Sequence, residues 1–88
     1  MGILKEKVER LIQKELGGSD VFLEELPQTE RLSGHVIWKG FDEMTAIERQ
    51  RHLRRMLRQM LTPEEEGSLS LLLALTPAEW DGIREEAA

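Results

Sequence analysis

The chain has 88 residues, the size of one domain, and its net charge of −5 argues against a general nucleic-acid coat protein. It contains no cysteine, which excludes disulfides and thiolate chemistry and is typical of proteins of the reducing cytosol. The N-terminus is charged from Lys5 and lacks an apolar signal segment. We therefore expect a cytoplasmic protein that forms a single domain over residues 1–88.

The first part of the chain predicts one helix followed by two strands. Apolar residues recur at helical spacing over residues 4–16, and Gly17-Gly18 ends the pattern. Residues 21–23 form a short β-prone run, and residues 33–39 are rich in β-branched and aromatic side chains. We expect these two runs to pair as antiparallel strands with a long polar connection over residues 24–30.

The next predicted element is a basic helix. Thr45 and Glu48 have the S/T-x-x-E form of a capping box, and the pattern stays amphipathic as far as Leu61. From Thr45 to Leu61, five arginines and one acid give a local charge of +4, which leaves −9 for the remainder of the chain. The arginines of this helix are Arg49, Arg51, Arg54, Arg55 and Arg58.

A third strand and a last helix complete the chain. Residues 62–67 indicate a loop or a single turn, and residues 68–75 a leucine-rich strand for which a helix is the alternative. The expected buried face of this strand consists of Leu69, Leu71, Leu73 and Leu75. On that expectation, Leu71→Asp should unfold the domain.

Thr76-Pro77-Ala78-Glu79 is typical of a helix start. The predicted order is therefore α-β-β-α-β-α. This is an α+β domain with a three-stranded mixed sheet and helices packed on one face.

No catalytic centre is recognisable in the sequence. His35 and His52 lie in different predicted elements and, without cysteine, are too few to form a metal site. We find no nucleophile with an adjacent base and no glycine-rich phosphate loop. An enzyme would need a pocket with a titratable pair, which the sequence does not indicate. We therefore predict a non-enzymatic binding domain without a metal or cofactor.

The arginines of the second helix allow two interpretations. They can solvate the helix and pair with nearby acids, and such surface pairs contribute only about 0–1 kcal/mol each. Alternatively, they form a docking face for an acidic protein or for the phosphates of a nucleic acid, which arginine binds in a bidentate manner. No G-x-x-G loop is present, which argues against a functional KH domain.

Several segments, in the same order along the chain, resemble the BolA family. Ser33 opens the second strand as the serine of the family's S-H-F segment does. Arg49-Gln50-Arg51 stands where the family has R-H-R, and Phe41 lies eight residues before it. Thr76-Pro77-Ala78-Glu79-Trp80 closely matches the T-P-x-E-W start of the family's last helix and is the most specific match. The resemblance spans about residues 8–83.

This resemblance implies a fold like that of type II KH domains. It also implies a partner of monothiol glutaredoxins in iron–sulfur cluster assembly or trafficking, and some family members are described as DNA-binding transcription regulators. The family's cluster-ligand histidine falls on Ser68, and its helix histidine falls on Gln50. Because a hydroxyl is a poor iron ligand, we carry over the fold and not the cluster.

A one-residue shift would place His35 at the family's second ligand position. We therefore take His35, Ser68 and the five arginines as candidate docking residues. The expected partner is a monothiol glutaredoxin or another protein, with nucleic acid as the alternative.

Overall fold

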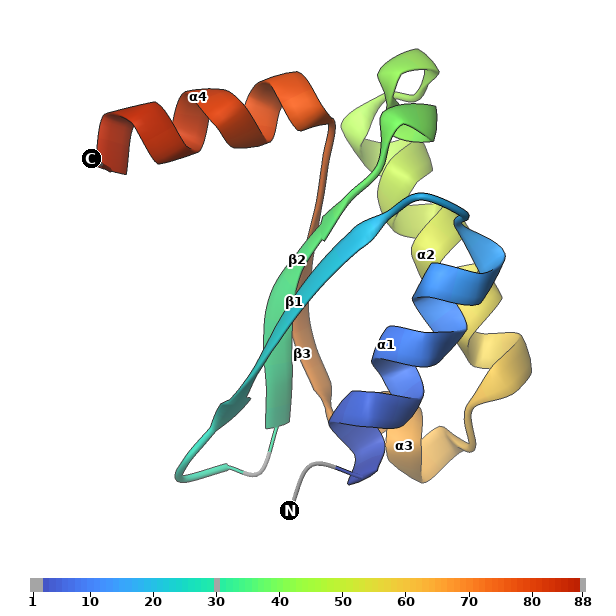
Figure 1. Cartoon of the computed structure of the whole chain (residues 1–88). Coiled ribbons are helices and arrows are strands. Elements are labelled where there is room, and N and C mark those ends of the chain that lie inside the picture. Colours follow the sequence, from blue (N-terminus) through green and yellow to red (C-terminus); the bar gives the residue numbers. More distant parts are fainter. Residues whose placement is uncertain (1–2, 30, 88) are drawn as a thin grey trace.

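The structure, a computed structural model, describes residues 3–29 and 31–87 as one three-stranded sheet with helices on both sides (Figure 1). In chain order the elements are α1 Ile3–Glu15, β1 Asp20–Leu26, β2 Arg31–Ile37, the 3-10 helix η1 Lys39–Glu43, α2 Ala46–Met60, α3 Pro63–Gly67, β3 Leu69–Leu75 and α4 Pro77–Ala87. Within the described ranges, no helix is both long and apolar enough to cross a membrane. The predicted α+β order is confirmed, and the residues left open as a loop or single turn form α3.

The sheet has the order β1-β2-β3, with β1 and β2 antiparallel and β2 and β3 parallel, as the mixed sheet was predicted to be. The long polar connection that we expected after residue 23 is wrong, because β1 continues to Leu26. Since β1 is an edge strand, the exposed Glu24 and Glu25 are compatible with strand structure.

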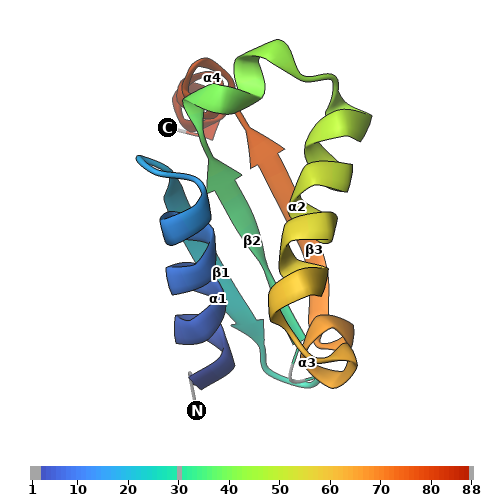
Figure 2. The same ribbon diagram turned by 90° about the vertical axis from the view of Figure 1, so that its right-hand side faces the viewer.

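The two long helices cover one face of the sheet, while α4 lies on the other side. Figure 2 shows α1 and α2 side by side in front of the strands, and Figure 1 shows α4 projecting from the opposite side. Our expectation that the helices pack on one face is therefore confirmed for α1 and α2 and wrong for α4. The core between these helices and the sheet contains Val8, Ile12, Leu16, Leu23, Leu32, Val36, Phe41, Leu53, Leu57, Leu61, Leu72 and Ala74.

From Leu71 onward, the third strand buries the face opposite to the one that we predicted, whereas Leu69 packs against the core as expected. Between the β2–β3 pairs Leu32–Leu69 and Gly34–Leu72, β3 has one residue more than β2, so the alternation of its side chains shifts. Leu72 is 8% exposed and lies in the core, whereas Leu71 is 58% and Leu73 37% exposed. The burial of Leu71, on which the expected unfolding by Leu71→Asp rested, is therefore wrong.

Two glycines are required by the backbone. Gly18, which follows α1, has a φ of 81°, a left-handed conformation that side chains disfavour. A Cβ at Gly34 would collide with the carbonyl oxygen of Phe22 on β1. Gly34 thus permits the close approach of the first two strands.

Three of the helices begin with the same Thr-x-x-Glu capping box. In each box the threonine hydroxyl accepts a hydrogen bond from the backbone N–H of the glutamate, and the carboxylate accepts one from the threonine N–H. The pairs are Thr45–Glu48 at α2, Thr62–Glu65 at α3 and Thr76–Glu79 at α4. The box that we predicted for the second helix is confirmed.

Candidate functional site

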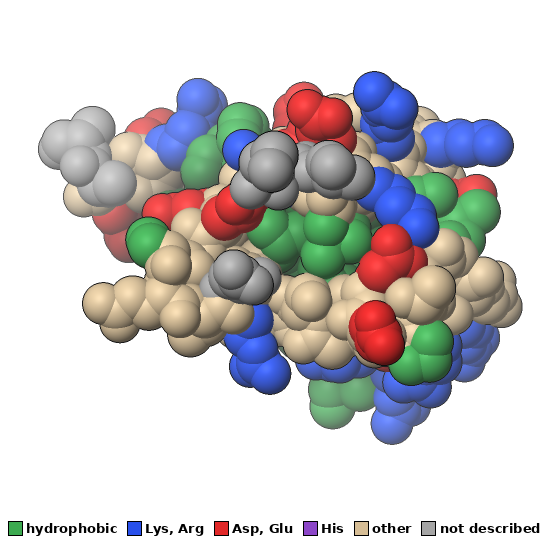
Figure 3. Space-filling model, turned by 90° about the horizontal axis from the view of Figure 1, so that it is seen from below, with side chains coloured by type: hydrophobic (Ala, Val, Ile, Leu, Met, Phe, Trp, Pro, Cys, Tyr) green, Lys and Arg blue, Asp and Glu red, His purple; other side chains and the backbone are tan. Residues whose placement is uncertain are grey.

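Four of the candidate arginines form one exposed surface on α2, which we call the arginine face: Arg51, Arg54, Arg55 and Arg58. Arg58 contacts Glu66 of α3, with 3.4 Å between Nε and Oε1. Within residues 3–29 and 31–87, the structure records no ion pair for the other three arginines. In the view from below, most of the Lys and Arg side chains in sight lie on the right, the side of α1 and α2 (Figure 3). This surface therefore offers guanidinium groups to a ligand.

Arg49 lies apart from the arginine face. Its side chain is only 12% exposed and points toward η1, the end of β3 and the start of α4. Nε donates hydrogen bonds to the carbonyl oxygens of Phe41 and Met44, each at 3.1 Å. Nη1 donates to Ala74 O at 3.3 Å and to Glu79 Oε1 at 2.6 Å. Arg49 thus holds elements of the fold together, and its donors are directed inward.

The signal that could have separated Arg49 from the other arginines is its spacing. Arg49 lies four residues before the buried Leu53 and eight before the buried Leu57, so it shares their helix face.

Gln50, at the position of the family's helix histidine, connects α2 to the third strand. Its side-chain Nε2 donates a hydrogen bond of 2.8 Å to the carbonyl oxygen of Leu72. Since β3 is an edge strand of the sheet, this bond satisfies a carbonyl that no neighbouring strand can reach. Gln50 therefore has a structural partner in this chain.

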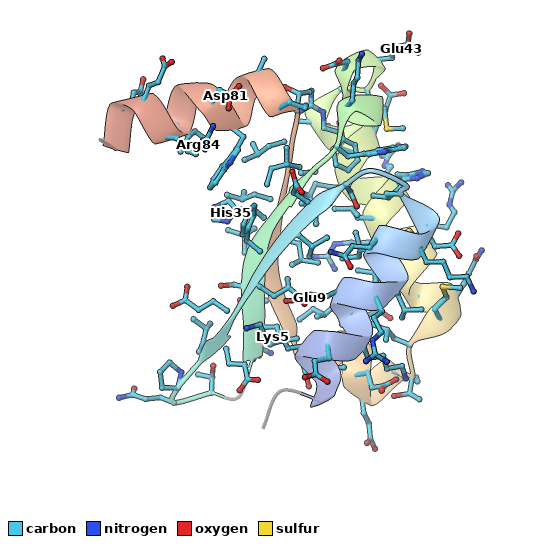
Figure 4. All side chains as sticks on the ribbon, viewed as in Figure 1. Lys5, Glu9, His35, Glu43, Asp81 and Arg84 are labelled. Carbon is cyan, nitrogen blue, oxygen red and sulfur yellow. The ribbon has the colours of Figure 1, made fainter. Side chains whose placement is uncertain are left out.

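His35 and Ser68 are not brought together. His35 lies in the middle of β2, on the side of the sheet that faces Arg84 of α4 (Figure 4), and its ring centroid is 5.2 Å from that of Trp80. Ser68 ends α3, where its hydroxyl donates a hydrogen bond of 3.2 Å to Glu64 O. Leu32 N bonds to Ser68 O, which places the serine about three residues, or about 10 Å, along the strand from His35.

This arrangement does not fit a ligand set for an iron–sulfur cluster. The chain has no thiolate, the Ser68 hydroxyl has a partner within α3, and the Gln50 amide binds the backbone of β3. Among the described residues, no group of three His, Asp or Glu side chains could hold a metal ion.

A surface that sequence analysis missed lies on the sheet face opposite α1 and α2. A groove of about 450 Å³, which we call the outer groove, is lined by Phe22, His35, Leu71, Leu73 and Trp80, with Glu24 at its margin. Phe22 is 50% exposed and stacks on Trp80 of α4 with 5.5 Å between ring centroids. We missed the groove because strand alternation alone assigned Leu71 and Leu73 to the core.

Comparison with known proteins bears on the fold. The structure of BolA1 from Arabidopsis thaliana is similar to this chain, with a TM-score of 0.66 over 90% of this chain and 98% of that chain. The chain has the BolA fold. The two sequences are 22% identical, so the likeness concerns the architecture. No family model and no curated protein matches the chain.

Proposed function

We propose that this BolA-fold chain is a non-enzymatic interaction domain that binds a protein partner beside its third strand. The observation that carries the proposal is the outer groove, where Leu71 and Phe22 are 58% and 50% exposed and Leu73 is 37% exposed. Neighbouring large apolar side chains that remain exposed are typical of protein-interaction surfaces. The docking face thus includes the third strand.

The BolA resemblance suggests a monothiol glutaredoxin as the partner. Docking on the outer groove needs no cluster ligand from this chain, which agrees with the internal hydrogen bonds of Ser68 and Gln50. We therefore expect a complex whose formation does not depend on a shared iron–sulfur cluster.

The test is calorimetric titration of the chain with a monothiol glutaredoxin from the same source, with and without its cluster. We expect binding in both cases and no change in the visible circular dichroism of the cluster. Leu71→Gln should weaken binding about tenfold, since it removes an apolar contact, while Ile47→Gln, at a 64% exposed position of α2, should not. Absence of binding to both forms would exclude this partner.

A second candidate function is nucleic-acid binding through the arginine face. The supporting observation is that Arg51, Arg54 and Arg55 are exposed side by side and, in the described part of the chain, make no ion pair. If four arginines neutralise phosphates, the logarithm of the binding constant should fall with the logarithm of the salt concentration with a slope of about −3.6.

The measurement for this second function is fluorescence anisotropy of labelled duplex DNA at several salt concentrations. The double variant Arg54→Glu/Arg58→Glu should abolish binding, and Arg10→Glu/Lys14→Glu on α1 serves as the charge-matched control. Equal effects of the two double variants would show that the binding responds to total charge rather than to the arginine face.

A further inference from the structure

The outer groove is the part of the outer sheet face that α4 does not cover. One face of the sheet is covered by α1 and α2, but α4 packs on the other face only near the upper end of the strands (Figure 1). Trp80 anchors α4 there by contacts with Phe22 and His35, at centroid distances of 5.5 and 5.2 Å. Leu71 and Leu73 continue the apolar surface away from α4, and no helix within residues 3–29 and 31–87 covers them.

The groove has the shape of a helix-binding site. Its floor is the outer face of the three strands, and one wall is α4, whose Ile83 is 42% exposed and follows Trp80 at helical i, i+3 spacing. A helix with a single apolar stripe that lay beside α4 could contact the floor through Leu71 and Leu73 and the wall through Ile83. Apolar stripes of this kind are how amphipathic helices dock in grooves.

The charge around the groove favours a basic occupant. Glu25 lies on the β1 face of the buried Leu23, and Glu79 pairs with Arg49. Without these two acids, the three strands and α4 contain five acidic and two basic residues, a balance of −3. One of the two bases, Arg84, contacts Asp81 of the same helix at 2.7 Å, and Glu24 lines the groove itself. A second copy of the chain would bring an equally acidic surface, so like charges oppose self-association through this face.

We propose that the outer groove binds an amphipathic helix of a partner protein, whose apolar stripe covers Leu71, Leu73 and Phe22 and whose lysine or arginine side chains lie along the acidic margin. This inference rests on the proposed docking function and names the chemical class of the partner segment. The arginine face lies on α2, on the other side of the sheet, and takes no part in it.

The test uses three synthetic peptides of about 18 residues, or about 27 Å as a helix. The first carries a leucine stripe flanked by lysines, the second has the same stripe flanked by glutamates, and the third has the lysine composition with the stripe scrambled. Binding is measured by calorimetry, and the site is located by NMR of leucine and isoleucine methyl groups. We expect the lysine peptide to bind at least tenfold more tightly than the other two and to shift the Leu71 and Leu73 methyl signals.

Two variants and one control variant locate the contact. Leu71→Gln should weaken the lysine peptide about tenfold without changing the net charge, and the matched Ile47→Gln should leave its affinity within twofold. Glu24→Gln should weaken the lysine peptide at low salt and have less effect at high salt, because exposed charges are screened. Retention of the fold is checked by circular dichroism.

Three results would overturn the inference. The lysine and glutamate peptides could bind with equal affinity, Leu71→Gln and Ile47→Gln could weaken the lysine peptide equally, or sedimentation could show that the chain forms a dimer that depends on Leu71. If a monothiol glutaredoxin bound in a Leu71-dependent manner while the lysine peptide did not bind, the docking function would stand and the helical, basic occupant would be wrong. If neither bound, both proposals would fail.

Discussion

Arg49 and Glu79 join α2 to the start of α4 through a contact of 2.6 Å between Nη1 and Oε1. The same glutamate accepts the N–H of Thr76 at 2.8 Å, so one carboxylate both caps α4 and binds the arginine. Because Arg49 also donates to carbonyl oxygens of η1 and β3, a single guanidinium connects α2 with three other elements. The position of α4, and hence of Trp80 over the outer groove, depends on this connection.

We predict that Arg49→Met lowers the free energy of unfolding by about 2–4 kcal/mol, because it leaves the part-buried carbonyl oxygens of Met44 and Ala74 without their side-chain donor. Arg49→Lys should restore little, since one ammonium cannot reproduce the fork of the guanidinium. Urea denaturation is the measurement, and Arg55→Met, at an exposed position of α2, should change stability by no more than about 0.5 kcal/mol. Similar losses of stability in Arg49→Met and Arg55→Met would argue against the connecting role of Arg49.

Substitutions at two adjacent leucines test the register of β3. Leu72→Asp should cost about 4 kcal/mol or more, because it places a carboxylate in the core, where the leucine is 8% exposed. Leu71→Asp should change stability by less than about 1 kcal/mol, since the leucine is 58% exposed. Chemical denaturation of the two variants is the measurement. A larger loss of stability in Leu71→Asp than in Leu72→Asp would show that Leu71, and not Leu72, faces the core.

The hydrogen bond of Gln50 to the third strand can be measured against a second glutamine of the same helix. Gln50→Met should lower the free energy of unfolding by about 1–3 kcal/mol, because Leu72 O loses its donor in a part-buried position. Gln59→Met, at an exposed position of α2, is the control and should change little. The expected order would be refuted if both variants had the stability of the parent chain.

The capping boxes predict a loss of stability in acid. Backbone hydrogen bonds from Thr45 and Thr76 hold the pKa values of Glu48 and Glu79 below the ordinary 4.5, and Lys7 is the main cause of the lowered pKa of Glu65. A carboxyl whose pKa is lower in the folded than in the unfolded protein stabilises the fold above about pH 4.5. This contribution is lost as the pH falls through the lowered pKa.

We therefore expect the urea midpoint to decrease when the pH is lowered from 5 to 3, and to decrease less in Glu79→Gln. The control is Glu85→Gln, an exposed glutamate outside the boxes, which should retain the dependence of the parent chain. A Glu79→Gln variant that followed the parent at every pH would show that this box does not contribute.

The sequence by itself determined the elements that depend on local interactions. The helical periodicity before Gly17-Gly18, the box at Thr45 and the Thr-Pro start at residue 76 involve groups only a few residues apart, so they predicted α1, α2 and α4. The sequence also predicted the mixed sheet and the fold, through element order and the T-P-x-E-W segment. The grouping of Arg51, Arg54, Arg55 and Arg58 on one face follows in the same way from helical spacing.

Only the tertiary structure decided which side of β3 is buried, what Arg49 binds and where α4 lies. The extra residue between Leu69 and Leu72 is defined by pairing with Leu32 and Gly34, more than thirty residues earlier, so alternation within β3 could not reveal it. Arg49 likewise contacts Ala74 and Glu79, which are 25 and 30 residues away in sequence. The outer groove exists because these long-range contacts turn Leu71 and Leu73 away from the core and hold α4 at one end of the sheet.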